Sequence, residues 1–161
     1  MPQESMTVKI VPYKPKYRKV FKDLNEEWIA AFFKMEPSDH KALDNPEKYI
    51  LDNGGSILVA LYGDEAVGVC ALIKMNDPEF DFELAKMAVS PKVQGKGIGW
   101  LLGNAILEEA KRMGAATLYL ESNTILEPAI QLYYKLGFQK IAGRYTPYER
   151  CNIQMGLTLI K

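Results

Sequence analysis

Three glycines, Gly95, Gly97 and Gly99, stand within five positions in the stretch VQGKGIGW, which leads into a run of helix-forming residues. A strand, a glycine-rich turn and a helix start can bind phosphate, because the first amides of a helix have no intrahelical partner. The spacing does not fit a P-loop, which needs Lys-Ser or Lys-Thr after its last glycine. It also gives GxGxG rather than the GxGxxG of a dinucleotide-binding turn. A simple tight turn at a helix start is the alternative.

Candidate acid and base groups lie in apolar segments near this loop. Glu83 alternates with apolar residues in FELAKMAV, and we expect it on the same side of the strand as Ala85, Met87 and Val89. A carboxylate among apolar side chains is unusual and suggests a specific role. Tyr133 lies on the apolar face of a helix-like segment, and spacing alone makes it a core residue. These groups suit proton transfer if the fold brings them to the phosphate-binding loop.

The elements that would position these groups follow from the apolar patterns. We expect a strand at 7–11, helices at 16–34 and 38–52, strands at 56–62, 66–73 and 80–89, a helix from the glycine loop to Gly114, a strand at 116–121, a helix from Pro128 to Leu136, and strands at 138–142 and 151–160. The order is β-α-α-β-β-β-α-β-α-β-β. It predicts one α/β (α+β) domain over 1–161, with a mixed, mostly antiparallel sheet flanked by helices.

Composition excludes several classes of protein. The chain has 161 residues, is 48% hydrophobic and 25% charged, and balances twenty basic against twenty acidic residues. These values suit a globular protein and argue against nucleic acid as the main partner. No apolar run approaches the ~20 residues of a membrane span, and the first residues show no signal pattern, so we expect no membrane and a cytoplasmic location. Cys70, Cys151 and the single His40 form no metal motif, and both thiols are expected to be structural.

The phrase MAVSPKVQGKGIGWLL resembles the acetyl-CoA-binding motif of the GNAT superfamily of N-acetyltransferases. That motif is a strand ending in V-x-P, followed by Q/R-x-x-G-x-G/A at a helix start, and Gln94, Gly97 and Gly99 fall on its positions. AIQLYYKLGF is similar to the family's A-x-x-x-Y-x-x-x-G-F block, and together the motifs cover residues 82–141. The family also shows the order of elements given above. The resemblance implies a GNAT-like acyl-CoA N-acyltransferase fold.

The same resemblance implies acetyl-CoA as cosubstrate and no metal. The amides from Gly95 to Trp100 would hold the pyrophosphate, and the end of the strand before the loop would pair with the pantetheine arm as an added strand does. Many members carry an asparagine where this chain has Leu126, and nearby Asn123 takes a shifted role or serves as a cap or turn. The expected coenzyme-binding residues are Met87, Ala88, Val89, Gln94, Gly95, Lys96, Gly97, Ile98, Gly99, Trp100 and Asn123.

The resemblance also assigns catalytic roles. Tyr133 occupies the position of the family's usual general acid, which would protonate the leaving thiolate, whereas Tyr134, about 100° around the helix, should have no role. Glu83 and Glu121 both match positions where members carry a catalytic glutamate. We prefer Glu83 as the base, acting directly or through a water. An ordinary surface or hydrogen-bonded carboxylate is the alternative for both.

In this fold the first two helices usually wall the acceptor pocket. The candidates from these helices are Trp28, Phe32, Phe33, Glu36 and Asp39, and those from the last strands are Tyr148 and Arg150. Carboxylates beside aromatic rings suit a cationic amine, whereas an arginine favours an acceptor that carries a carboxylate. These indications conflict.

The sequence therefore predicts an N-acetyltransferase that moves an acetyl group from acetyl-CoA to a primary amine of a small molecule or protein by direct transfer in a ternary complex. It does not name the acceptor. The alternative is a non-catalytic acyl-CoA-binding sensor or regulatory module. Homodimers are common in the family, and the resemblance is compatible with one here.

Overall fold

One seven-stranded sheet organises the molecule. The computed structural model describes residues 7–159, and its strands lie in the order β1-β2-β3-β4-β5-β7-β6. Their bounds are β1 Val8–Pro12, β2 Ser56–Tyr62, β3 Glu65–Lys74, β4 Phe82–Val89, β5 Thr117–Ser122, β6 Gln139–Lys140 and β7 Ile153–Thr158. All neighbours pair antiparallel except β4 and β5. The predicted mixed, mostly antiparallel sheet and order of elements are confirmed; the ends of the expected 1–161 domain, with position 160 of the last strand, lie outside the described residues.

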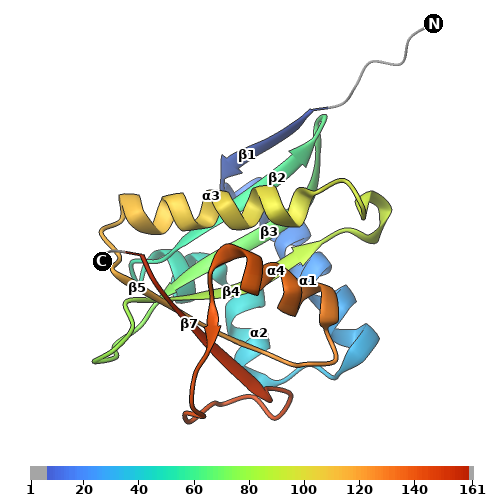
Figure 1. Cartoon of the computed structure of the whole chain (residues 1–161). Helices are drawn as coiled ribbons and strands as arrows, with labels where there is room; N and C mark the ends of the chain where they lie inside the picture. The colour runs from blue at the N-terminus through green and yellow to red at the C-terminus, as the bar shows by residue number, and fades with distance from the viewer. Residues whose placement is uncertain (1–6, 160–161) are drawn as a thin grey trace, which may run out of the picture.

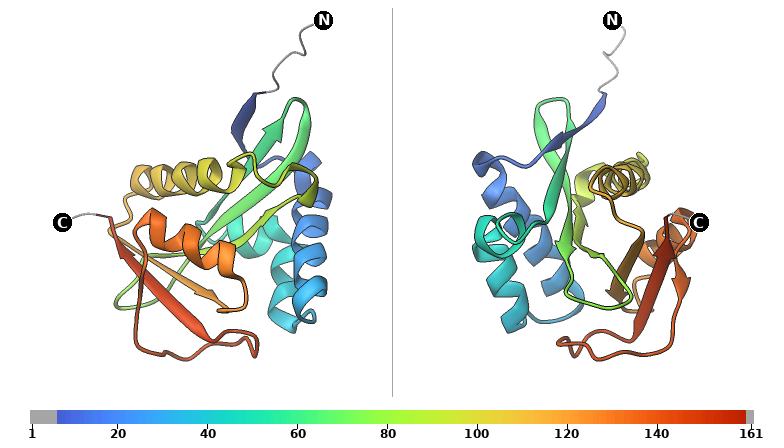
Figure 2. Two further views of the ribbon diagram at one scale, coloured as in Figure 1. Left: turned by 45° about the vertical axis from the view of Figure 1, so that its right-hand side comes forward. Right: turned by 90° about the vertical axis from the view of Figure 1, so that its left-hand side faces the viewer.

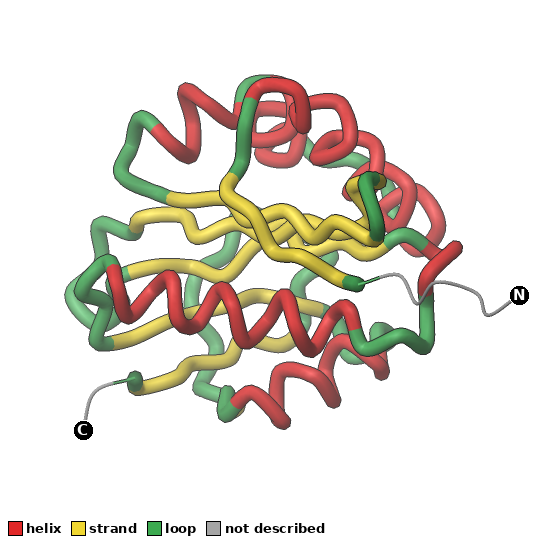
Figure 3. Tube along the Cα trace, turned by 90° about the horizontal axis from the view of Figure 1, so that it is seen from above, coloured by secondary structure: helices red, strands yellow, loops and turns green. Residues whose placement is uncertain are grey.

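Helices cover both faces of the sheet. The helices α1 (Arg18–Phe32) and α2 (Pro37–Asp44) lie on one face, and α3 (Ile98–Arg112) and α4 (Glu127–Leu136) lie on the other (Figures 2 and 3). Each face has its own apolar core, one containing Phe21 and Ile29 of α1 and the other Leu102 and Ile106 of α3. Because β2 and β3 are buried on both sides, their sequences are continuous apolar runs rather than alternating ones.

Two expected helices have different bounds in the structure. The segment expected as one helix over 38–52 is divided, because α2 ends at Asp44 and a single π-helical turn, Glu47–Leu51, follows. Pro46 is the reason: a proline disfavours the helical conformation in the residue before it, and Asn45 has φ −144° and ψ 67°. The first helix, expected over 16–34, begins at Arg18 after a short 3-10 turn and ends at Phe32.

A β-bulge at Lys86 changes which side chains of β4 share a face. Lys86 has φ +54°, the only positive φ of a non-glycine residue within 7–159, and the register with β3 shifts here. Before the bulge Phe82 lies in the core under α3, and after it Met87 and Val89 pack against that core. An inserted residue reverses the alternation of a strand. The expectation that Glu83 shares a face with Met87 and Val89 is therefore wrong.

The strands β4 and β5 separate soon after they meet. They pair only at Phe82 with Leu118 and at Glu83 with Tyr119, and Figure 1 shows them diverging beyond that point. The remainder of β4, residues 84–89, has no strand partner on its β5 side among the described residues. The divergence leaves a gap in the middle of the sheet between the helices of the two faces.

Asp39 closes one end of this gap. Its side chain is fully buried in α2 and accepts hydrogen bonds from Lys86 Nζ at 2.7 Å and from Arg150 Nη1 and Nη2 at 2.6 and 2.5 Å. Burial alone would raise the pKa of Asp39, but the bonds from Arg150 and the charge of Lys86 outweigh it and lower the pKa from 3.8 to about 2. The ionised carboxylate thus joins α2 to β4 and to the segment before β7.

We expect Asp39→Asn to lower the free energy of unfolding by about 3 kcal/mol or more at pH 7, because it leaves the buried Lys86 without a carboxylate and Arg150 with only the longer contact to Glu36. Urea unfolding followed by circular dichroism measures this. The matched control is Asp44→Asn on the same helix, which breaks the exposed ion pair with Lys22 and should leave the midpoint nearly unchanged. Equal effects of the two changes would contradict this role of Asp39.

Candidate active site

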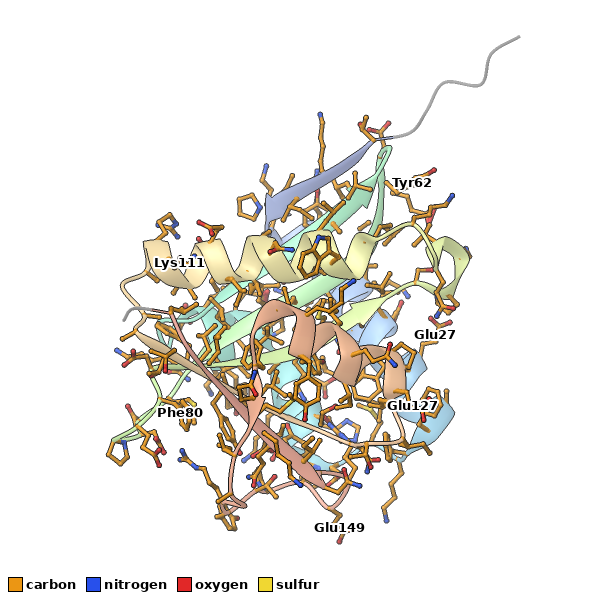
Figure 4. The ribbon with its side chains drawn as sticks, in the orientation of Figure 1. Glu27, Tyr62, Phe80, Lys111, Glu127 and Glu149 are labelled. Carbon is orange, nitrogen blue, oxygen red and sulfur yellow. The ribbon has the colours of Figure 1, made fainter. Side chains whose placement is uncertain are left out.

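A cleft of about 550 Å³ fills the gap between β4 and β5. Side chains of α1 line one end, and the glycine loop and α4 line the other; in Figure 4 Glu127 marks the first turn of α4. This volume is in the range of small-ligand sites. Of the residues expected to act on a ligand, the lining includes Met87, Ala88, Val89, Gln94, Gly95, Gly97, Ile98, Gly99, Asn123, Glu83, Glu121 and Tyr133.

The glycine loop presents free amides to the cleft. Gly95 and Gly97 have φ of +82° and +73°, and Gly97 is the residue directly before α3. The amides of residues 95–100 donate to no acceptor among the described residues. Such amides at a helix start, with the helix dipole behind them, attract an anion. The loop therefore has the backbone conformation that a phosphate group needs.

Lys96 and Trp100, two residues expected to bind the coenzyme, do not line the cleft. The Lys96 ammonium lies over the ring of Tyr62, which is labelled in Figure 4, and Trp100 is 42% exposed beside Lys135. Ile98 does line the cleft, but its side chain is buried in the core under α3, and its amide has no acceptor among the described residues.

Two carboxyl groups lie where the strands separate, in different environments. Both oxygens of Glu121 accept hydrogen bonds, from Tyr119 Oη and from Thr146 Oγ1, each at 2.6 Å. Glu83 pairs across the sheet with Tyr119 but has no hydrogen-bond partner for its carboxyl group within the described chain. Burial raises the pKa of Glu83 from 4.5 to about 7, the charge of Glu121 adds to this, and Lys86 opposes it. Glu83 is therefore close to half-ionised at neutral pH, as a general base requires.

Tyr133 and its neighbour Tyr134 lie in different environments. The partly buried Tyr133 lines the cleft, packs edge-to-face on Phe138 at 6.3 Å, and has no hydrogen bond from its hydroxyl to any described residue. Burial raises the pKa of this phenol well above its usual range, so the hydroxyl stays protonated. Tyr134 is 44% exposed and is not part of the lining. Of these two tyrosines, only Tyr133 is placed to donate a proton into the cleft.

Asn123 uses its own side chain locally. Its amide nitrogen donates to the carbonyl of Arg150 at 2.7 Å, and its side-chain oxygen accepts from the amide of Ile125 at 2.9 Å. These bonds fit the turn alternative, and a contact of Asn123 with a coenzyme stays a prediction.

The acceptor candidates divide into two groups. Trp28 and Phe32 of α1 line the cleft, as do Phe33, which directly follows α1, Tyr148 and Arg150. Glu36 and Asp39 do not. Both are buried, and both accept hydrogen bonds from Arg150. The two carboxylates therefore hold the wall together rather than face a ligand.

Sequence reasoning missed several residues of this cleft, and Lys86 and Cys151 are two of them with reactive side chains. Lys86 lines it from the bulge of β4, and its position inside the apolar stretch FELAKMAV is the same kind of signal that singled out Glu83. Cys151, expected only as a structural thiol, is partly buried and also lines the cleft. A single cysteine before a strand carries no distinguishing pattern. No group of three His, Cys, Asp or Glu residues in the described part could hold a metal ion, and no helix there is long and apolar enough to cross a bilayer.

Comparisons with known proteins agree with this geometry. Residues 18–138 match the family model described as "Acetyltransferase (GNAT) family". N-acetyltransferase 8F1 of Rattus norvegicus is 33% identical over 123 residues, which cover 74% of this chain and 53% of that protein. The chain thus spans about half the length of the first curated relatives it matches.

Two solved structures show the same fold. An acetyltransferase of the GNAT family from Staphylococcus aureus MU50 has a TM-score of 0.83 at 20% identity and covers 95% of this chain and 99% of its own. A Bacillus subtilis acetyltransferase in complex with CoA has a TM-score of 0.68 at 22% identity and covers 96% and 99%.

The raised pKa of Glu83 makes a prediction about stability. A group whose pKa is higher in the folded than in the unfolded protein stabilises the fold below its unfolded pKa and loses this contribution as pH rises through the folded value. With the pKa moving from 4.5 to about 7, wild type should lose about 3 kcal/mol relative to Glu83→Gln between pH 4 and pH 8. Urea unfolding of both proteins at the two pH values measures the difference. A constant difference would contradict the raised pKa.

Proposed function

The chain belongs to the acetyltransferase (GNAT) family, and on that premise we propose that it transfers an acetyl group from acetyl-CoA to a primary amine by direct transfer while both are bound. One observation carries the proposal: a single cleft brings together free helix-start amides, a buried protonated phenol and a carboxyl group whose pKa is near neutral. Phosphate binding, proton donation and proton removal are the three tasks that this reaction sets for a protein.

The residues of the cleft fit coenzyme A. The free amides of residues 95–100 suit its pyrophosphate, because backbone donors at a helix start bind anions without needing basic side chains. The unpaired edge of β4 at Met87–Val89 suits the amides of its pantetheine arm, which would extend the sheet as an added strand does. Acetyl-CoA, when bound there, supplies the activated acetyl group and the thiolate as leaving group.

Glu83 acts as the base in this proposal. An amine arrives as an ammonium ion and must lose a proton before it can attack. A carboxylate with a pKa of about 7 accepts that proton far better than one at the usual 4.5, either directly or through a water. Because the carboxyl group has no hydrogen-bond partner among the described residues, nothing has to break before it acts.

Tyr133 acts as the acid. The leaving thiolate needs a proton, and a thiol has a pKa near 8.5. Burial keeps the phenol protonated, and its hydroxyl is not engaged by another described residue. It can therefore donate its proton to the sulfur as the carbon–sulfur bond breaks. Because this phenolate is a stronger base than the thiolate, the transfer is completed only when the phenolate regains a proton, which the attacking amine releases as it becomes an amide.

We expect Tyr133→Phe to lower kcat/KM by a factor of about 10² to 10⁴, the usual contribution of a positioned proton donor. Release of free coenzyme A thiol across a panel of amines measures this. Tyr134→Phe, one position along the same helix, is the control and should leave the rate unchanged. Loss of activity in both variants, or in neither, would contradict the role of Tyr133.

The base has a pH signature. In wild type, kcat/KM should rise as pH increases through about 7, because the deprotonated form of Glu83 is the active one. In Glu83→Gln this step should vanish and the rate at pH 8 should fall by about 10²-fold or more. A variant that keeps the step would show that another group titrates, with Glu121 the next candidate.

A wild-type protein that binds acetyl-CoA but releases no thiol with any amine would support the sensor alternative instead.

Coenzyme binding can be tested separately at the glycine loop. Gly97→Ala strains a left-handed backbone position and adds a Cβ beside the free amides, and we expect the Kd for coenzyme A to rise about tenfold or more. Gly114→Ala is the matched control, because Gly114 follows the other end of α3, has φ +84° and also has open space around it. Both variants should lose similar stability, but only Gly97→Ala should weaken binding in calorimetry. Equal Kd values would place the pyrophosphate elsewhere.

A further inference from the structure

We call the end of the cleft that is lined by Trp28, Phe32 and Phe33 the acceptor end, and the cations beside it, Lys86 and Arg150, are already paired. Both terminal nitrogens of Arg150 donate hydrogen bonds to Asp39, and Nη1 also lies 3.4 Å from a carboxylate oxygen of Glu36. Its guanidinium lies 4.4 Å from the ring centroid of Tyr148, and its side chain is 12% exposed. Lys86 bonds Asp39 at 2.7 Å and the hydroxyl of Tyr148 at 3.1 Å, with 5% of its side chain exposed. These two cations and two carboxylates neutralise one another, so none of the four is free for a ligand.

The charge that remains in the cleft is acidic and small. Both oxygens of Glu121 are already hydrogen-bonded, by Tyr119 and Thr146. Of the two carboxyl groups that line the cleft, only that of Glu83 lacks a hydrogen-bond partner among the described residues. The cleft therefore offers a position for one ammonium group and has no free cation for an acceptor's carboxylate.

The rest of the acceptor end is apolar. Trp28 and Phe33 pack edge-to-face at 6.5 Å, and Phe32 lies next to them with its ring 6.4 Å from that of Phe33. Ile125 lines the cleft from the segment before α4. Phe32 and Ile125 are 54% and 59% exposed although both line the cleft. Large apolar side chains left exposed at the opening of a cleft are typical of a surface that an apolar ligand covers.

We propose, resting on the function proposed above, that the acceptor is a small primary amine whose only charge is its ammonium group and whose body is an apolar aryl or alkyl group. The ammonium goes to Glu83, and the body packs against Trp28, Phe32 and Phe33 and extends toward Ile125, which lines the same cleft. An amino acid would bring its carboxylate beside Glu83 and Glu121 with no free cation to receive it. A polyamine would bring a second ammonium that finds no free carboxylate, and a sugar amine would lose water from hydroxyl groups without regaining hydrogen bonds.

A matched set of acceptors tests this with the purified protein and acetyl-CoA. 2-Phenylethylamine and phenylalanine differ by one carboxylate, and spermidine adds further charges. We expect kcat/KM for 2-phenylethylamine to exceed that for the other two by about 100-fold, the size of effect that an unpaired buried charge has. Across linear alkylamines from propylamine to hexylamine, kcat/KM should rise about fourfold for each added methylene. A flat series, or phenylalanine or spermidine as the better substrate, would overturn the proposal.

Variants locate the apolar site. Phe32→Ala and Ile125→Ala should each raise the KM for 2-phenylethylamine by about three- to tenfold, with less than a twofold effect on propylamine. Tyr49→Ala removes another exposed aromatic side chain, 37% exposed and outside the lining, and should change neither value. Equal effects on the two amines would contradict contact between these side chains and the acceptor body.

Binding separates this inference from the reaction. Calorimetry with the protein saturated with coenzyme A ranks the same amines without turnover. The expected ranking together with thiol release supports both proposals. The expected ranking without release from any amine supports the apolar acceptor site and overturns the proposed reaction. Release with a different ranking supports the reaction and overturns the proposed acceptor.

Discussion

The parallel pairing of β4 with β5 stops after two residues, and the rest of the structure depends on this. Buried backbone groups need hydrogen-bond partners, so a strand edge left open in the middle of a sheet must face a ligand or water. Helices on both faces of the sheet wall this gap, with α1 at one end and α4 at the other. The gap is therefore a cleft inside the molecule. Glu83 is the last paired residue of β4 before the gap. It is therefore desolvated by the sheet and still reachable from the cleft.

The segment between β6 and β7 holds the two parts of the sheet at this separation. Arg144 lies against the rings of Phe80 and Tyr119 at 5.0 and 5.1 Å, and Phe80 is labelled in Figure 4 near the turn before β4. Further along, Arg150 reaches across to Asp39. A buried ion pair adds little net stability compared with apolar packing, but it tolerates only one geometry. Its contribution here is to fix the width of the acceptor end, which apolar contacts alone would leave adjustable.

Local rules explain which parts the sequence could predict. Gly97 and Gly137 have a left-handed backbone at the start of α3 and the end of α4. Because glycine favours this conformation by itself, the local sequence is enough to predict both helix ends. The bulge at Lys86 has no such local signal. The Asn25 side chain donates to the Lys86 carbonyl at 3.1 Å, and this partner lies on α1, far away in the sequence. Arg150 and Asp39 are also far apart in the sequence, so their pairing could not be predicted. Without it, the sequence supported both an acceptor site for cations and one for anions.

Desolvation connects the reactivity of the cleft to its choice of acceptor. Burial is the largest contribution to the raised pKa of Glu83 and also to that of Tyr133. Both shifts depend on the cleft remaining apolar, because water around either group would return its pKa toward the usual value. An acceptor with an apolar body displaces water from the same space, whereas a polar one would carry its hydration in. On the proposals made above, the walls that select the acceptor are also the walls that raise the pKa values of Glu83 and Tyr133. A substitution that makes these walls more polar weakens recognition and proton transfer together.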